Sequence, residues 1–419
     1  MRLRKFNNVI RNYQLNMKLG ITGPDVLINN GGAQIHAINV IKILSDYYNI
    51  IYFPDPILYN LFRRNKDMII KKAKELEKNG IKIVNSFYYL IDKNYNYNKI
   101  IDIYSEEKTD FLFDLDFINN SILPQKFTIT LSKKMNLKFG VCFQSLGDFN
   151  LHLLYYIYFI IKLCKKFKIF LYLLYHYINR HILLFNLLRS KSLSFILVMN
   201  NNYSKNINLR FKNIELLDPS NGINNPKINI SLYKDNKREN KMIFFARLGY
   251  MKGIFDIPEI LKYILKNYDT KLVIVGKFDR ISDKNLFFKL INKYKLNDRI
   301  IYRGYLSDEN LFKEISTSKL MIYPSHSDSF SLAVAQSLIL NTPVIAYSIA
   351  GLKIYKNFNA VKLVNEFEYK SMADEAIKIL KMENTDELFD KNINDFLARC
   401  TWYNVAMQYR NVIEKYVNS

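Results

Sequence analysis

The stretch YPSHSDSFSLAVAQSLILNTPVIAY, residues 323–347, sets the fold of the C-terminal half. An apolar run ends at Pro324, and the small polar residues that follow it are typical of a loop. A helix is predicted over residues 330–340, because Asn341 suits the left-handed position after a helix and Pro343 bars its continuation. The stretch therefore predicts a strand, a polar loop, a helix and a second strand.

A helix that starts directly after a strand can bind phosphate through its free backbone N–H groups and its dipole. By this chemistry alone, an ordinary strand-to-helix turn is an equally good interpretation. A second segment, FARLGYMKG at residues 245–253, places Arg247 and Lys252 at the carboxyl end of another strand. Two cations at this spacing suit a diphosphate. The alternative is that both are solvated surface cations.

Short apolar runs alternate with helix-length segments along the rest of the chain, which predicts parallel sheets covered by helices on both faces. The expected strands of the C-terminal half are Lys241–Ala246, Lys271–Val275, Ile300–Tyr302, Lys319–Tyr323, Pro343–Tyr347 and Val361–Val364. Those of the N-terminal half are Lys18–Thr22, Asn49–Phe53, Lys82–Ser86, Asp110–Leu115, Phe139–Phe143 and Phe195–Met199. Helices are expected at Ala33–Tyr47, Lys66–Asn79, Ile254–Asn267 and Leu311–Ser318.

The chain of 419 residues is too long for one compact core, so more than one domain is expected. The turn-forming run DPSNGINNPK suggests a hinge, placed at residues 219–228. We expect two Rossmann-like α/β domains, residues 1–218 and 229–399, that face each other across a cleft. Residues 400–419 are expected to form a helix that packs back toward the N-terminal domain.

The charge balance favours an anionic partner, since 61 Lys and Arg face 38 Asp and Glu, a net charge of +23. Nucleic acid, an acidic membrane face and phosphorylated substrates all fit that charge. Cys142, Cys164 and Cys400 lack metal-ligand spacing and are expected to be thiols in a reducing, cytoplasmic compartment. Residues 1–16 have no apolar core, so no secretory signal is predicted there.

The aromatic and lysine-rich segment at about residues 151–190 indicates a membrane surface. Its uncharged run, residues 151–161, falls well short of the ~20 residues that span a bilayer. Interfacial helices on an anionic membrane fit this pattern, and a helical pair packed on the N-terminal domain is the alternative. Single-stranded nucleic acid would also suit exposed Tyr and Lys, but no RNA- or DNA-binding motif is present. Nucleic acid is therefore not expected as a partner.

Seven segments, in order across most of residues 17–416, resemble glycosyltransferase family 4. This family is also called glycosyltransferase group 1, and it has the GT-B fold. The segments are GGAQIHAINVIKIL, PSNGI, FARLGYMKG, KLVIVGKFD, IIYRGYLSDENLFKEISTSKLMIYPS, SDSFSLAVAQSLILNTPVIAY and TWYNVAMQYRNVIEKY. One of them alone would be a weak signal, whereas the ordered set is specific.

The resemblance implies a retaining glycosyltransferase that needs no cofactor and no metal. It would move a sugar from a nucleotide diphosphate donor, UDP- or GDP-linked, to a lipid-linked or membrane-proximal glycan on the cytoplasmic membrane face. The implied catalytic residues are Arg247, Lys252 and Asp328. The implied donor-binding residues are Gly31, Gly32, Gly276, Lys277, Gly304, Tyr305, Leu306, Ser329, Phe330, Ser331, Leu332 and Gln336.

His36 and Gln144 are the candidates for contacts with the acceptor or the cleft. For His36, a polar position on the helix expected at Ala33–Tyr47 is an equally good interpretation. Gln144 stands where the family often carries a histidine after a strand, so the catalytic residues of the N-terminal half stay open.

The sequence also departs from the family's pattern. The usual pair of glutamates is replaced by Asp328 and Gln336, and two loop glycines are replaced by Ser329 and Ser331. These changes keep open a non-catalytic protein that binds sugar nucleotides, or a subunit of a glycosylation complex. Asp114-Leu115-Asp116 mimics the D-x-D metal motif of a different glycosyltransferase fold and is interpreted as structural.

Overall fold

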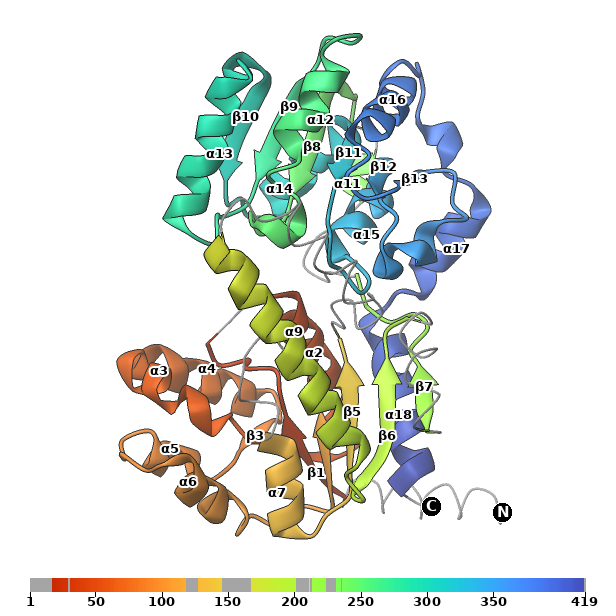
Figure 1. Cartoon of the computed structure of the whole chain (residues 1–419). Coiled ribbons are helices and arrows are strands. Elements are labelled where there is room, and N and C mark those ends of the chain that lie inside the picture. The colour runs from red at the N-terminus through yellow and green to blue at the C-terminus, as the bar shows by residue number, and fades with distance from the viewer. Residues whose placement is uncertain are drawn as a thin grey trace, which may run out of the picture. The chain divides into compact units, whose positions relative to one another are not determined.

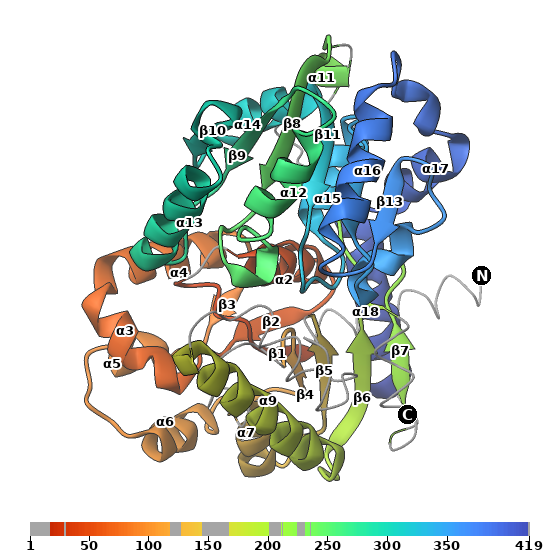
Figure 2. The same cartoon turned by 45° about the horizontal axis from the view of Figure 1, so that its top comes forward.

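The chain folds into two compact α/β units. The computed structural model describes residues 17–28, 31–117, 127–144, 167–200, 211, 213–223, 231–234 and 236–417 (Figures 1 and 2). The first unit comprises Met1–Gly222 and Thr401–Ser419, and the second comprises Ile223–Cys400. The division therefore falls within the turn-rich segment expected as a hinge, and the C-terminal residues belong to the first unit.

The first unit is built on a seven-stranded sheet with the order β3-β2-β1-β4-β5-β6-β7. Every strand pair in it is parallel. The strands are β1 (Lys18–Thr22), β2 (Asn49–Tyr52), β3 (Lys82–Ile83), β4 (Phe111–Asp114), β5 (Phe139–Phe143), β6 (Leu193–Val198) and β7 (Ile214–Leu216). The helices are α2 (Gly32–Leu44), η1 (Pro56–Leu58), α3 (Tyr59–Arg64), α4 (Lys66–Lys78), α5 (Phe87–Leu90), α6 (Tyr97–Tyr104), α7 (Phe127–Met135), α9 (Phe167–Leu188) and α18 (Trp402–Val417).

The second unit is built on a six-stranded parallel sheet with the order β10-β9-β8-β11-β12-β13. The strands are β8 (Glu239–Phe245), β9 (Lys271–Val275), β10 (Ile300–Gly304), β11 (Ser318–Tyr323), β12 (Val344–Tyr347) and β13 (Val361–Val364). The helices are α11 (Ser231–Lys234), η3 (Tyr250–Lys252), α12 (Ile257–Ile264), α13 (Ile281–Lys293), η4 (Asn297–Arg299), α14 (Asp308–Ser316), α15 (Leu332–Ile339), η5 (Ala350–Tyr355), α16 (Tyr369–Leu380), η6 (Asp386–Leu388) and α17 (Lys391–Arg399).

The predicted fold class, two parallel-sheet α/β domains, is confirmed. Each strand expected from the sequence has a counterpart, although β3 holds only Lys82–Ile83 of the run expected to reach Ser86. The helix expected at Ile254–Asn267 is shorter, with α12 at Ile257–Ile264. The edge strand β7 at Ile214–Leu216 was not expected, because three residues give too short a pattern to recognise.

The order of the strands creates one switch point in each sheet, where successive strands begin to add on the opposite side. In the first sheet the switch lies between β1 and β4, and in the second it lies between β8 and β11. Open α/β sheets bind ligands outside the carboxyl ends of the strands at such a point. The fold therefore singles out the loops after β8 and β11 in the second unit and those after β1 and β4 in the first.

Part of the segment expected at a membrane surface, residues 151–166, lies outside the described residues. The remainder forms α9, which runs along the surface of the first unit (Figures 1 and 2). Among the helices that the structure describes, none is long and apolar enough to cross a membrane.

Arg238 forms hydrogen bonds to the C-terminal ends of two helices in the second unit. Its guanidinium donates to the backbone oxygens of Ser316 at 2.6 Å, at the end of α14, and of Leu340 at 2.9 Å and Asn341 at 2.8 Å, just after α15. It also donates to Thr342 Oγ1 at 2.7 Å. The last carbonyls of a helix have no partner within it, and a cation there complements the helix dipole. One side chain thus satisfies the ends of two helices that flank β11.

We expect Arg238→Ala to destabilise the second unit by at least 2–3 kcal/mol, because several buried carbonyls lose their donor at once. Arg238→Lys should recover only part of this loss, since an ammonium group cannot reproduce the planar fork of donors. The measurement is urea unfolding of the full chain. The neighbouring exposed Lys237→Ala should change the free energy of unfolding by less than about 0.5 kcal/mol. Equal effects of the alanine variants at both positions would contradict this role of Arg238.

Candidate functional site

The candidate site lies in the loops that follow the parallel strands of the second sheet. Because these strands run the same way, their carboxyl ends meet at one edge of the sheet. The loop after β8 carries Arg247 and Lys252, and the loop after β11 leads from Pro324 into α15. These two loops flank the switch point of the sheet, where a ligand site is expected.

Lys252 forms an ion pair with Asp328 across these two loops. Lys252 Nζ lies 2.7 Å from Asp328 Oδ1 and donates to the backbone oxygen of Ser327 at 2.8 Å. The other carboxylate oxygen, Oδ2, accepts from Ser325 Oγ at 2.7 Å and from Tyr323 OH at 2.8 Å. Both side chains are largely buried, with 21% and 11% of their area exposed. The structure thus brings together two of the three residues predicted as catalytic and fixes both.

The close approach of the loops depends on glycine. Gly253 has a φ of +74°, and a Cβ at this position would lie 1.9 Å from the backbone oxygen of Pro324. A Cβ on Gly351, in η5, would lie 1.9 Å from the backbone oxygen of Asp328. No side chain fits at either position, so the loop after β11 is held on two sides by glycine backbone.

Arg247, the third predicted catalytic residue, is exposed at the carboxyl end of β8. No hydrogen bond or ion pair joins its side chain to any residue in the described part of the chain. Its backbone is placed by the hydrogen bond from Gly249 N to Arg247 O at 3.1 Å. The guanidinium therefore remains available to an anion at the edge of the sheet.

The predicted helix start is found two residues later than expected, with Ser331 as the N-cap of α15. Ser331 Oγ accepts from Val334 N at 3.3 Å, and its φ of +62° lies in the left-handed region that favours glycine. The chain thus keeps the backbone conformation of a glycine while carrying a serine. Of the other residues predicted on this stretch, Phe330 is buried, whereas Ser329, Leu332 and Gln336 are half-buried.

The other residues of the second unit that are predicted to bind the sugar-nucleotide donor follow β9 and β10, at the carboxyl edge of the sheet. Gly276 has a φ of +141°, and a Cβ there would lie 1.9 Å from the backbone oxygen of Ala246. Gly304, with a φ of +68°, has nothing within 4 Å of an added Cβ. Lys277 Nζ lies 5.2 Å from the ring centre of Tyr305, which is 70% exposed. Leu306 is half-buried, so these loops offer a partly exposed aromatic surface.

Sequence analysis missed a charged group, His326, which lies within the loop after β11. The side chain of His326 has no exposed area, and its Nδ1 and Nε2 lie 2.8 Å from Glu366 Oε1 and 3.0 Å from Asp256 Oδ2. Burial alone would lower the pKa of His326, but hydrogen bonds and charge from the two carboxylates outweigh it and raise the pKa to about 9. His326 is therefore a buried imidazolium at neutral pH. Asp256 and Glu366 lie 70 and 40 residues from His326 in the sequence, so no local motif indicated that they would pair with it.

His36, predicted to contact the acceptor or the cleft, is part of the core of the first unit. Its side chain has no exposed area, and its ring nitrogens lie 3.0 Å from Asn221 Oδ1 and 2.9 Å from Tyr409 OH. Both nitrogens are therefore engaged by the protein. The helix position weighed as the alternative is thus a buried one, and the contact of His36 with the acceptor or the cleft stays a prediction.

The glycine pair of the first unit begins α2. Gly31 is its N-cap, and Gly31 N donates to Gln34 Oε1 at 3.0 Å. Among the described residues, none lies within 4 Å of a Cβ added at Gly32. Gln144 follows β5 and is buried, with its amide nitrogen donating to the backbone oxygen of Leu115 at 2.7 Å. The roles predicted for Gly31, Gly32 and Gln144 stay predictions.

Asp114 and Asp116 are both buried at the end of β4. Asp114 accepts hydrogen bonds from Thr128 Oγ1 at 2.5 Å and from Asp116 N at 3.0 Å. Burial raises the pKa of Asp114 to about 6, against the lowering effect of these hydrogen bonds. The arrangement supports a structural role for the motif. Among the described residues, no group of three or more His, Cys, Asp or Glu side chains is placed to hold a metal ion.

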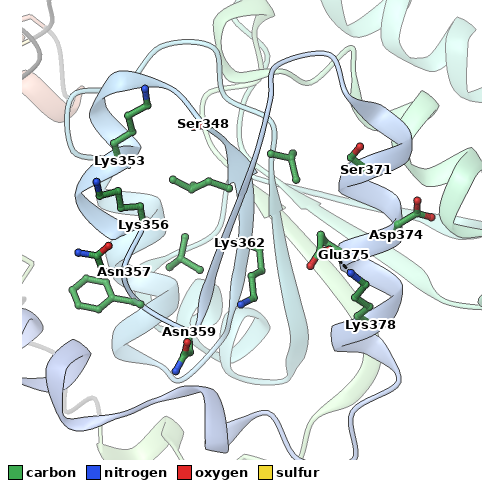
Figure 3. Close-up of a pocket in the computed structure, with 14 residues that line it drawn as sticks. Ser348, Lys353, Lys356, Asn357, Asn359, Lys362, Ser371, Asp374, Glu375 and Lys378 are labelled. Atoms are coloured by element: carbon green, nitrogen blue, oxygen red, sulfur yellow. Dashed lines mark hydrogen bonds and ion pairs between the residues drawn. The ribbon is translucent and has the colours of Figure 1, made fainter.

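A pocket of about 770 Å³ opens at the edge strand β13, between η5 and α16 (Figure 3). It contains none of the residues predicted for the donor. Lys353 and Lys356 stand on its η5 side, and Asp374, Glu375 and Lys378 stand on its α16 side. Lys353 and Lys356 are exposed, and Lys378 forms an ion pair with Glu375 on α16, so we assign this pocket no ligand.

Comparison with known proteins finds matches among glycosyltransferases. Residues 229–396 match the family model of the glycosyl transferases group 1. This match covers the second unit almost completely and includes every residue predicted as catalytic. An uncharacterised glycosyltransferase of Methanocaldococcus jannaschii is 25% identical over 114 residues, which is 27% of this chain. The aligned part spans only 28% of that relative.

Solved structures resemble the whole chain. A glycosyltransferase from Rickettsia africae matches with a TM-score of 0.63 and 17% identity, covering 96% of this chain and 99% of its own. HepE of Anabaena, crystallised in complex with UDP and glucose, matches with a TM-score of 0.65 and 13% identity, covering 96% of this chain and 100% of its own. At these identities the likeness shows the fold alone, and that fold is GT-B.

Burial of His36 should make the stability of the first unit depend on pH. Burial lowers the pKa of His36 to about 4, against the raising effect of its hydrogen bond to Asn221. The unfolded chain binds this proton below about pH 6.5, so His36 stabilises the fold above that pH and its contribution is lost as the pH falls toward 4. Acidification from pH 7 to 4 should lower the stability of the wild type, relative to His36→Gln, by up to about 3 kcal/mol.

The measurement is the difference in unfolding free energy between wild type and His36→Gln at each pH, since buried carboxyl groups of the same unit titrate in this range and cancel in the difference. A difference that does not change between pH 7 and 4 would show that His36 is accessible to solvent.

Proposed function

We propose that the chain is a retaining glycosyltransferase that moves a sugar from a UDP- or GDP-linked donor to a glycan acceptor. The observation that carries the proposal is the placement of Lys252, Arg247 and the start of α15 at the switch point of the second sheet. The match of residues 229–396 to the glycosyl transferases group 1 supports it. The binding of UDP and glucose by HepE supports a nucleotide sugar as the donor.

The donor diphosphate binds to Arg247, Lys252 and the first N–H groups of α15. An ammonium group has three N–H donors, and Lys252 uses two of them on Ser327 and Asp328. The third can bind a phosphate oxygen without breaking the ion pair. Arg247 adds a second, exposed cation, and the dipole of α15 favours negative charge at its start.

The same groups promote the chemical step. As the bond between sugar and diphosphate breaks, negative charge grows on the leaving phosphate, and Arg247 and Lys252 are already in place to stabilise it. Positioning of donor and acceptor supplies the rest of the rate enhancement. In this mechanism no cofactor or metal is required, and no protein nucleophile forms a bond to the sugar.

Asp328 and Gln336 contact the rest of the donor. Asp328 holds Lys252 and also accepts from a sugar hydroxyl, since each carboxylate oxygen has two acceptor sites. Gln336, half-buried on the next turns of α15, accepts from a ribose hydroxyl. The loops at Gly276–Phe278 and Gly304–Leu306 flank the nucleobase, where the exposed ring of Tyr305 offers a stacking surface.

The acceptor is a lipid-linked or membrane-proximal glycan, reached from an anionic membrane surface. On α9 five large apolar side chains are 48–52% exposed: Leu171, Tyr175, Ile178, Ile182 and Phe185. Their spacing of four, three, four and three residues places them on one face of the helix. Arg189 extends this face, with its guanidinium 4.9 Å from the ring centre of Phe185. An apolar stripe that ends in a cation fits an interfacial helix on anionic lipid.

Mutations of Lys252 and Asp328 should separate binding from catalysis. Lys252→Ala should weaken UDP or GDP binding by about 10- to 150-fold, because a charge-assisted hydrogen bond is worth about 1.5–3 kcal/mol. Asp328→Asn should leave nucleotide affinity unchanged or higher, because Lys252 is released toward the phosphate, while turnover falls at least tenfold. The measurements are isothermal titration with nucleotides and transfer or slow hydrolysis of the donor, both with EDTA present.

The exposed Lys381→Ala is the matched control and should bind as the wild type does. A wild type that binds a nucleotide sugar but neither transfers nor hydrolyses it would support a non-catalytic sugar-nucleotide-binding protein instead. Activity that is lost in EDTA and restored by Mn²⁺ would contradict the metal-independent mechanism.

The stripe on α9 should bind vesicles. We expect Ile178→Asp to weaken binding to phosphatidylcholine vesicles that contain phosphatidylserine by about tenfold or more, because it removes apolar area and adds a repelled charge. Leu61→Asp is the control, since Leu61 is 45% exposed on α3 but lies outside the stripe. Vesicle sedimentation at two salt concentrations measures the effect. Equal binding to neutral and acidic vesicles, or equal loss in both variants, would overturn the assignment.

A further inference from the structure

The buried imidazole of His326 joins three loops at the carboxyl edge of the second sheet. His326 belongs to the loop that carries Asp328, and its partner Asp256 ends the loop that carries Lys252. Its other partner, Glu366, belongs to the loop after β13. The backbone adds a third link, because His326 N donates to Met251 O at 2.9 Å. His326 therefore contacts Met251, which directly precedes Lys252, and it lies two residues before Asp328 in the same loop.

The surroundings of His326 match a positive charge. Asp256 Oδ2 also accepts from Tyr347 OH at 2.8 Å, and Tyr369 OH lies 3.5 Å from Asp256 Oδ1. The rings of Phe367 and Tyr347 lie against the imidazole, with ring centres 4.9 and 5.2 Å away. Among the described residues, the titratable groups placed around it on α12, β12, α16 and the loop after β13 include the carboxylates of Asp256 and Glu366 and the phenols of Tyr347 and Tyr369.

We propose that His326 is a positioning residue of the donor site, whose imidazolium fixes the loop carrying Asp328 and the start of α15 against the loop carrying Lys252. The inference rests on the proposed function of this same site. His326 itself, with no exposed area, does not touch the substrate. It acts through the placement of Asp328 and Lys252, where a shift of about 1 Å can cost ~100-fold in rate.

Removal of the proton leaves the carboxylates of Asp256, which is buried, and Glu366, which is half-buried, without a cation between them. Asp256 and Glu366 then repel each other, and the loops that they anchor separate. The pKa of His326, about 9, places this change on the alkaline side of neutrality. The donor site is therefore held together at neutral pH and loosened above about pH 9.

The first experiment measures the loops without any donor. Hydrogen exchange at residues 325–332 and 249–253 is compared between wild type, His326→Gln and Glu366→Gln. Both variants should exchange at least tenfold faster in these two loops, while β8 and β11 keep their protection. Glu368→Gln, an exposed glutamate two residues further on, should exchange as the wild type does. Unchanged exchange in the two loops of His326→Gln, or uniform acceleration across the unit, would overturn the proposal.

The second experiment separates positioning from mere stability. Per folded molecule, His326→Gln should lower kcat at least tenfold and raise the donor KM, and its activity should no longer fall between pH 8 and 10 as that of the wild type does. His326→Lys, which keeps the charge, should recover part of the rate. A variant that melts earlier but keeps the wild-type kcat and pH profile would reduce His326 to a structural role.

The two experiments fail independently. If no nucleotide sugar binds to the wild type, the proposed function falls, whereas the exchange experiment still decides whether His326 orders the two loops. If the donor binds and turns over but the loops and the pH profile are unaffected by His326→Gln, the proposed function stands and the positioning role falls.

Discussion

Two glycines hold the loop on which the candidate site depends. Gly253 leaves no room for a side chain beside the carbonyl of Pro324, and Gly351 leaves none beside the carbonyl of Asp328. The loop after β11 is therefore seated between two backbones, and this contact brings Lys252 within 2.7 Å of Asp328. A single methyl group at either glycine would push the loop away and separate the ion pair. The chemistry proposed for this edge of the sheet thus rests on backbone packing as much as on charge.

The fold was largely predictable, because buried parallel strands are short continuous apolar runs that end at turn formers. The runs at Lys271–Val275 and Lys18–Thr22 coincide with β9 and β1 as they stand in the structure. Prediction failed where the apolar run was too short or ambiguous. β7 holds three residues, Ile214–Leu216, and is recognisable only through its pairing with β6.

The candidate site was predictable only in its local part. Arg247, Lys252 and Asp328 stand in recognisable segments, but the pairing of Lys252 with Asp328 joins residues 76 positions apart. His326 and His36 show the limit more clearly, since the first is a buried cation and the second a buried neutral ring. The carboxylates of Asp256 and Glu366 lie beside His326, whereas the amide of Asn221 and the phenol of Tyr409 lie beside His36. These partners come from distant segments, so the tertiary structure decides what each histidine does.

The described loops at the two switch points differ in their cations, since those after β8 and β11 carry Arg247 and the Lys252–Asp328 ion pair. At the end of β1 and β4 in the first unit, the described residues include the buried carboxyl groups of Asp25 and Asp114, and burial raises the pKa of each to about 6. Their charged forms would repel a diphosphate at neutral pH. At the end of β8 and β11 in the second unit, Arg247 and Lys252 attract one. The net charge of +23 does not distinguish the units. The local arrangement does, and it supports our proposal that the donor phosphate binds in the second unit.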